Sequence, residues 1–193
     1  MRFSTLFVVL SAASALATLF KRDASTVKAD IAIINTEFNT MDDGVSFESG
    51  SVPPGDREAG TLAVIEAFDN STSALGFSLK NATANTHASD AFSQDDGSSI
   101  LSSIERTLPV INHAFNEMVK RKEDIESFGG ELIEPGVMLQ LMLQDMKDLN
   151  NDMSSFISSI AAKVPSSLVD QVNSINGSIT SAFDKVITAY SGS

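Results

Sequence analysis

The chain has 193 residues, 13 basic and 25 acidic, so its formal net charge is −12 at pH 7. Such an acidic surface repels nucleic acid and anionic membranes, which excludes nucleic-acid binding as a function. There is no cysteine. Disulfides, thiolate zinc sites and cysteine nucleophiles are therefore excluded, and the fold has to be stabilised by its own apolar core.

The first residues predict export. Residues 1–17 combine a basic residue at position 2, an apolar run and a small-residue cleavage pattern that ends at Ala17. This is the pattern of a secretory signal peptide, and it is too short to span a bilayer. We expect no transmembrane segment, and the polar C-terminus carries no lipid-anchor signal.

A dibasic pair follows the signal peptide. Lys21 and Arg22 end a short pro-segment, residues 18–22, where a processing protease can trim the chain. The remaining part, residues 23–193, has 171 residues and is expected to form a single domain. Its net charge is −15, because three basic residues leave with the first 22.

Apolar residues then recur at steps of three and four, which is the period of an amphipathic helix. Five such series follow one another. Their positions are Val27, Ile31, Ile34, Phe38 and Met41; Leu62, Ile65, Phe68, Thr72, Leu75 and Leu79; Leu101, Ile104, Leu108, Ile111, Phe115, Met118 and Ile125; Leu139, Met142, Met146, Leu149, Met153, Phe156 and Ile160; and Leu168, Val172, Ile175, Ile179, Phe183, Val186 and Tyr190. No strand alternation competes with this spacing.

The segments between the series have the composition of loops. They are residues 43–55, residues 93–99, Gly129-Gly130 with Pro135, and Pro165. Short connections favour antiparallel neighbours. The sequence therefore predicts an all-α antiparallel bundle of about five amphipathic helices. Pro109 lies inside the third series, where it removes one backbone hydrogen bond and is expected to kink or split that helix.

Motifs for catalysis or metal binding are missing. The two histidines, His87 and His113, have no cysteine or second histidine at zinc-ligand spacing, and no Gly-x-Ser-x-Gly elbow accompanies them. The MDDG and QDDG sequences lack the first ligand and the closing Glu of a calcium loop. We expect no metal, no cofactor and no enzyme activity.

Three sequons lie in the mature part of the chain, at Asn70, Asn81 and Asn176. A chance sequon is common, so each one alone is weak evidence. On a secreted chain, however, we expect at least one of them to be glycosylated.

Methionines gather on the fourth series. Met138, Met142 and Met146 fall on one helix face, and Met153 follows one heptad later. Methionine is flexible and fills irregular gaps, so this face is either ordinary core or the wall of a pocket that accepts ligands of several shapes. Our hypothesis is that Met142 and Met146 line a pocket.

The order of several segments resembles a known family. Pro109 is followed by the basic run 120–122 and Phe128, an Ala-Lys-x-Pro turn starts at Ala162, and residues 182–190 read Ala-Phe-x-x-Val-Ile-x-x-Tyr. With DIAIINTEF near the start, these features resemble the fungal hydrophobic surface-binding protein A family. The same domain occurs in fungal cell-wall galactomannoproteins. The resemblance covers residues 23 to 190.

This resemblance implies a secreted, non-enzymatic helical bundle that binds fatty acids or other lipids in its apolar core, and we expect a monomer. It also implies two alternatives: adsorption to hydrophobic surfaces with recruitment of a secreted esterase or cutinase, and a ligand-free cell-wall or immune-facing antigen. Loose association with the cell wall fits each of them. The ligand-contacting residues expected on this basis are Ile34, Phe38, Phe68, Ile104, Leu108, Ile111, Phe115, Met138, Met142 and Met146.

Two further expectations bear on these alternatives. Adsorption requires exposed apolar surface, which Val45, Phe47 and Val52 in the long loop can provide unless the loop folds them inward. No side chain can be assigned to a lipid carboxylate, because Gln140 and Gln144 lie on the helix face away from the methionines.

Overall fold

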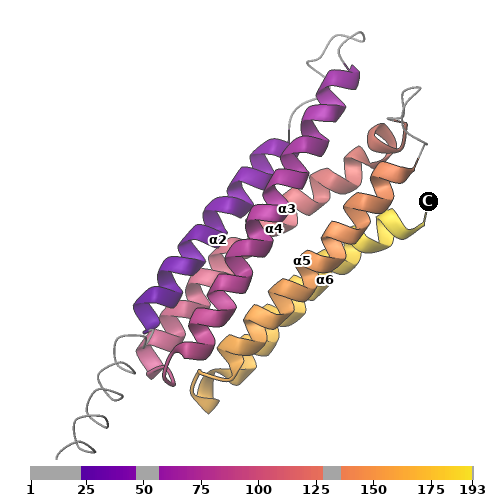
Figure 1. Cartoon of the computed structure of the whole chain (residues 1–193). Helices are drawn as coiled ribbons and strands as arrows, with labels where there is room; N and C mark the ends of the chain where they lie inside the picture. The colour runs from indigo at the N-terminus through magenta and orange to yellow at the C-terminus, as the bar shows by residue number, and fades with distance from the viewer. Residues whose placement is uncertain (1–22, 47–56, 128–135, 193) are drawn as a thin grey trace, which may run out of the picture.

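The computed structural model describes residues 23–46, 57–127 and 136–192, and these form five long helices (Figure 1). The helices are α2 (Ala24–Val45), α3 (Arg57–Ala88), α4 (Gln94–Ser127), α5 (Val137–Ala161) and α6 (Val169–Ser191), with a short 3-10 turn, η3 (Ser166–Leu168), before α6. No strand occurs in the three ranges, so the prediction of an all-α bundle is confirmed. Within them, no helix has an apolar run long enough to cross a membrane.

Successive helices run in opposite directions along one long axis (Figure 1). In cross-section the five helices form a ring: α2 packs against α3 and α4, α3 against α5, and α6 against α4 and α5. Consecutive α3 and α4 touch at few positions, as do α4 and α5. Among consecutive helices only α2–α3 and α5–α6 are therefore close neighbours, because α4 lies across the ring from α3 and α5. A short connection does not by itself make two helices neighbours here.

The apolar faces of all five helices meet in one core. Every apolar position predicted for the first, fourth and fifth series is buried. The rings of Phe115 and Phe183 pack edge to face with centroids 4.7 Å apart, an arrangement that contributes about 0.5–1.5 kcal/mol beyond burial itself. Two predicted core positions differ. Leu62 is exposed because the first turns of α3 extend past the end of α2 (Figure 1), and Leu108 is half-buried beside the fully buried Thr107.

Two helix boundaries differ from the prediction. α2 continues to Val45, three residues into the predicted loop, and Val45 is buried in the core, which is the inward alternative of the two stated for it. α4 already starts at Gln94, inside the predicted polar break, because the Ser93 hydroxyl caps it by accepting the Asp96 N–H at 3.1 Å. Phe47 and Val52 lie outside the described residues.

The proline in α4 does not interrupt the helix. α4 runs continuously through Pro109, so the alternative of a split helix is wrong, while the kink stays a prediction. Pro109 is exposed, where water can bond the carbonyl that loses its helical partner. The predicted signal peptide, the dibasic pair, Gly129-Gly130 and Pro135 all lie outside the described residues.

Candidate functional site

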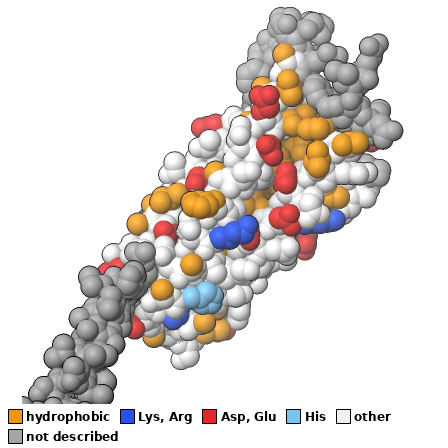
Figure 2. All heavy atoms as spheres, in the orientation of Figure 1, with side chains coloured by type: hydrophobic (Ala, Val, Ile, Leu, Met, Phe, Trp, Pro, Cys, Tyr) orange, Lys and Arg blue, Asp and Glu red, His pale blue; other side chains and the backbone are white. Residues whose placement is uncertain are grey.

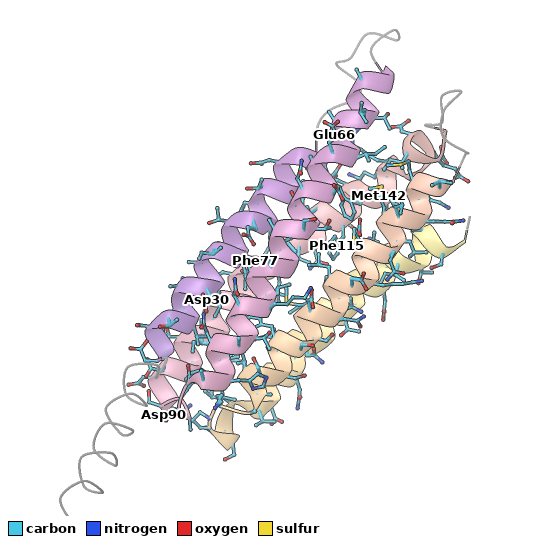
Figure 3. All side chains as sticks on the ribbon, in the orientation of Figure 1. Asp30, Glu66, Phe77, Asp90, Phe115 and Met142 are labelled. Atoms are coloured by element: carbon cyan, nitrogen blue, oxygen red, sulfur yellow. The ribbon has the colours of Figure 1, made fainter. Side chains whose placement is uncertain are left out.

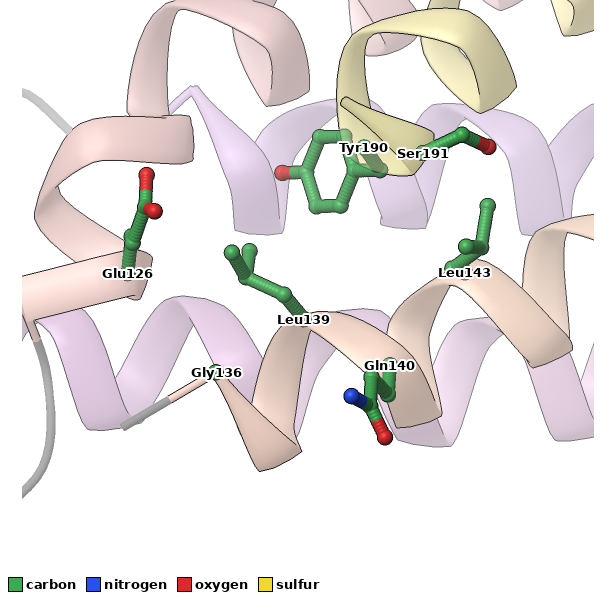
Figure 4. A pocket seen from close by; sticks show the side chains of 7 residues that line it. All are labelled: Glu126, Gly136, Leu139, Gln140, Leu143, Tyr190 and Ser191. Atoms are coloured by element: carbon green, nitrogen blue, oxygen red, sulfur yellow. The ribbon is translucent and has the colours of Figure 1, made fainter. Parts of the chain in front are cut away.

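A cavity of about 430 Å³ opens at the end of the bundle where α5 begins and α6 ends (Figure 4). Its lining residues are Glu126 of α4, Gly136, Leu139, Gln140 and Leu143 at the start of α5, and Tyr190 and Ser191 of α6. This volume is within the range of small-molecule binding sites. We call this end of the bundle the cavity end.

The cavity has apolar walls and a polar rim. Figure 4 shows Leu139 and Leu143 pointing from α5 toward α6, with the Tyr190 ring facing Leu139. The Glu126 carboxylate lies at one edge, and Gln140, which was expected on the face of α5 away from the methionines, belongs to the cavity lining. The walls therefore suit an aliphatic chain, and among the described lining residues the one charged group is acidic.

Tyr190 fixes the α6 side of the cavity. Its side chain is 3% exposed, and its hydroxyl donates a hydrogen bond to the Met118 carbonyl oxygen of α4 at 3.0 Å. Burial raises the pKa of the Tyr190 phenol well above its ordinary value, because the ionised form would lose its hydration. The phenol is thus neutral at ordinary pH and ties α6 to α4 next to the cavity.

The ten residues predicted to contact a ligand lie in the packed core, not on the cavity wall. Eight of them are buried, and Leu108 and Met138 are half-buried. On α5, Met142 and Met146 each lie about one turn beyond Leu139 and Leu143, so they form the core layer next to the cavity. Figure 3 shows Met142 near the cavity end and Phe115 closer to the middle of the bundle.

Methionine is concentrated in this half of the core. Five of the six methionines in the described ranges lie on the cavity-end half of their helices: Met41, Met118, Met138, Met142 and Met146. Their unbranched side chains can adopt several rotamers at low cost, which branched core residues cannot do. The core beside the cavity is therefore its most deformable part.

Other hollows of the described surface lie between α3 and α5. A groove of about 320 Å³ between α3 and α5 is lined by Phe77, Lys80, three aspartates and other side chains. Burial, together with the charges of Asp69 and Asp148, raises the pKa of Asp145 in this groove. A second α3–α5 groove, of about 500 Å³, is lined mainly by hydroxyl side chains. In the described part of the chain, no His, Asp and Glu side chains cluster closely enough to hold a metal ion.

The sequence did not indicate the cavity itself. Glu126, Leu143 and Ser191 were assigned to no site, and Tyr190 was expected only as the last buried position of its helix. Leu143 was not among the predicted positions because it lies beside the apolar stripe of α5 and outside its three-four spacing. Tyr190 did offer a clue: it is the single tyrosine of the chain, and it ends an otherwise fully apolar series.

Comparison with known proteins gives the family. The model of the hydrophobic surface binding protein A family matches residues 24–162. Cell wall mannoprotein 1 of Aspergillus fumigatus is 25% identical over 194 residues, which cover 98% of this chain and 60% of the relative. The chain thus spans less than two thirds of that relative's length.

Solved structures share the fold. AFMP4P in complex with palmitic acid superposes with a TM-score of 0.73 at 21% identity, over 87% of this chain and 99% of the other. Ligand binding domain 1 of the Penicillium marneffei MP1 protein, complexed with arachidonic acids, gives a TM-score of 0.67 at 13% identity, over 84% and 95% of the two chains. Since the family model covers more than half of the chain, the protein belongs to the hydrophobic surface binding protein A family.

Proposed function

We propose that this protein is a non-enzymatic, extracellular carrier of fatty acids or similar lipids, whose acyl chain enters the bundle through the cavity between α4, α5 and α6. The observation that carries the proposal is the position of this leucine-walled cavity directly against the methionine-rich part of the core. The two fold relatives solved with palmitic acid and with arachidonic acids support it.

The core has to rearrange for a long acyl chain to bind. The chain first contacts Leu139 and Leu143 and then displaces Met142 and Met146 behind them. Burying about ten methylenes contributes on the order of 8 kcal/mol at ~0.8 kcal/mol each. The loss of translational and rotational freedom on binding costs several kcal/mol of this gain, so we expect micromolar to sub-micromolar affinity. In this bound state Met142 and Met146, two of the ten core residues predicted from the sequence, are ligand contacts.

The rim determines which head group binds best. Of the lining residues that the structure describes, Glu126 alone is charged, and the whole chain carries a net negative charge. An ionised carboxylate at the rim is repelled by this charge, whereas a neutral head group or a protonated acid is not. The protein should therefore bind an uncharged sixteen-carbon alcohol at least as tightly as ionised palmitic acid at neutral pH.

Two measurements test the proposal. Mass spectrometry of organic extracts from the folded secreted protein should detect bound lipid. Titrations of palmitic acid and its alcohol should show that Glu126→Gln strengthens binding of the acid and leaves the alcohol unaffected. Glu123→Gln is the matched control, because it makes the same charge change on an exposed site of α4 outside the cavity lining. Absence of any saturable lipid binding would end the proposal.

Adsorption to hydrophobic surfaces is a second candidate function, favoured by one observation. Leu62 on α3 and Val137 and Leu141 on α5 are large, exposed apolar side chains close to the helix starts at the cavity end. Figure 2 shows hydrophobic side chains gathered near this end on the face in view. Lipid-free protein that adheres to polystyrene and binds an esterase would favour this function, whereas lipid that copurifies with folded monomer favours the carrier.

A further inference from the structure

The middle of α3 carries the most exposed large apolar side chain of the described surface. Phe77 is 70% exposed (its place is labelled in Figure 3), and Ile33 of α2 is 51% exposed. Neither belongs to the cavity end or to the proposed lipid site. An exposed aromatic ring on a secreted protein is a site for which a covering group should be sought.

The helix register brings both side chains to one sequon. Phe77 lies four residues before Asn81 on α3, so the two side chains are neighbours on the helix surface, roughly 5–6 Å apart at their Cβ atoms. Asn81 itself is exposed. Phe77 and Asn81 therefore share the outward face of α3.

Ile33 reaches the same place from α2. The Ser78 hydroxyl donates to Glu37 Oε1 at 2.8 Å, and Asn85 Nδ2 donates to Asp30 Oδ2 at 2.9 Å, which sets the antiparallel register of α2 and α3. Since Ile33 lies between Asp30 and Glu37, it stands level with the turn of α3 that holds Asn81. Two exposed apolar side chains thus flank one glycosylation acceptor.

We propose that Asn81 carries an N-linked glycan whose first N-acetylglucosamine packs on Phe77 and Ile33. One face of this sugar presents C–H groups, which pack against an aromatic ring while the hydroxyls stay in water. The glycan would thereby cover apolar surface that no part of the described protein covers. This inference is separate from the proposed lipid-binding function.

The attachment is a group transfer from a lipid-linked oligosaccharide diphosphate. The Asn81 Nδ2 atom forms a bond to C1 of the first sugar and loses one proton, while the C1–O bond breaks and the lipid diphosphate leaves with the electron pair. In the folded helix the Thr83 hydroxyl of the sequon donates to the Leu79 carbonyl oxygen at 2.7 Å. The transfer therefore takes place during export, before α3 forms.

The other two sequons, at Asn70 and Asn176, have no exposed apolar side chain of the described surface within reach in the way that Asn81 has Phe77 and Ile33. Phe77 lies two turns from Asn70, beyond the reach of a first sugar that points outward from the helix. Next to Asn176 on α6, the apolar side chains Val172 and Ile179 are buried. Asn176 therefore serves as an internal control.

The test uses the full chain secreted from a fungal host. Peptide mass spectrometry measures occupancy of Asn81, and an endoglycosidase trims the glycans to a single N-acetylglucosamine. We expect the trimmed protein to melt about 2–4 °C above the Asn81→Gln variant. In a Phe77→Ala background this difference should disappear, and Ile33→Ser should reduce it. Asn176→Gln should give no difference that depends on Phe77.

Two results would overturn the proposal. One is an unmodified Asn81 in the secreted protein. The other is a stabilisation by the trimmed sugar that is the same in the native and Phe77→Ala backgrounds, because the sugar then acts without the ring. Phe77→Ala replaces an exposed side chain inside a helix, and circular dichroism verifies that each variant is folded before the comparison.

Discussion

At the end of the bundle opposite the cavity, the two connecting segments are bonded directly to each other. The Phe92 N–H donates to the Lys163 carbonyl oxygen at 2.8 Å, and Lys163 Nζ donates to the carbonyl oxygens of Ser89 at 2.6 Å and His87 at 3.1 Å. The Ser167 hydroxyl adds a bond to Gln94 at 2.7 Å. We call this the linked end.

The cavity end is held differently. Tyr190 bonds to a carbonyl of α4, and Arg121 Nε donates to the Val45 carbonyl oxygen at 2.9 Å, so α4 is tied to α6 and to α2. In the described ranges, the start of α5 has no side-chain cap and borders the cavity through Gly136. Methionines contribute many of the apolar contacts at the cavity end, next to Leu139 and Leu143.

The difference shows where this bundle can change shape. The linked end combines backbone bonds with branched core residues, which have few alternative rotamers. The cavity end combines a hollow with methionines, which have many. A guest molecule should therefore be accommodated at the cavity end while the linked end stays fixed.

The largest expected effects come from core truncations at the two ends. Leu101→Ala near the linked end and Met146→Ala near the cavity end both remove fully buried side chains and should each lower the free energy of unfolding by about 2–5 kcal/mol. Saturating palmitic acid should restore part of the loss in Met146→Ala only, because an acyl chain can fill that space. Urea unfolding with and without lipid measures both values. Equal recovery in the two variants would remove the distinction between the ends.

Smaller effects are expected when the side-chain hydrogen bonds of Lys163 and Tyr190 are removed. Lys163→Met leaves carbonyl oxygens at the linked end without their partner and should cost about 1–3 kcal/mol without changing the rate of lipid release. Tyr190→Phe should cost only about 0.5–1.5 kcal/mol but should accelerate lipid release, because it unties α6 from α4 beside the cavity. Stopped-flow displacement measures the rates. Faster lipid release in Lys163→Met, but not in Tyr190→Phe, would contradict lipid entry at the cavity end.

Replacing two methionines by leucine should affect stability least of the core changes. Leu nearly conserves the volume of Met, so the double variant Met142→Leu, Met146→Leu should lose less than about 1.5 kcal/mol. The stiffer side chains should narrow the range of acyl chains accepted, with kinked chains losing affinity before saturated ones. Titration of a fatty-acid series checks this. Unchanged affinities throughout would mean that both residues are ordinary core.

The smallest effect concerns pH at the cavity-end half of α4. His113 Nδ1 lies 2.6 Å from Asp42 Oδ1 of α2, and this contact raises the pKa of His113 above its ordinary value of about 6.5. Because the pKa of His113 is higher in the folded than in the unfolded protein, its charged form stabilises the fold fully below pH 6.5. This stabilisation is lost as the pH rises through the pKa that His113 has in the folded protein. Stability should therefore decline slightly above pH 6.5, and His113→Gln should remove this slope. A proton NMR titration that gave a pKa at or below 6.5 would contradict the contact.

Much of this fold was predictable because apolar residues that repeat with the helix period mark the buried face of each helix. Val27, Ile31, Ile34 and Phe38 repeat at three and four and are all buried on α2. Boundaries were less certain, since they depend on single polar atoms: the Ser93 hydroxyl starts α4 inside a stretch that looked like a loop. Periodicity therefore predicts elements better than it predicts their ends.

The arrangement of helices and the cavity could not be predicted in this way. Periodicity shows which face of α4 is buried but not that α4 lies across the ring from α3. The cavity is formed by the ends of three helices, which bring Glu126, Leu139 and Tyr190 together from positions far apart in the sequence. Its location is a property of the ring order, and only the structure provides that.

The most direct test of lipid entry at the cavity end uses Tyr190 itself. The chain has one tyrosine and no tryptophan, so its intrinsic fluorescence reports on this wall of the cavity alone. We expect a palmitic acid brominated on its chain to quench the emission saturably, and unlabelled palmitic acid to reverse the quenching. Saturable binding of the brominated acid without quenching would place the lipid elsewhere and contradict the account.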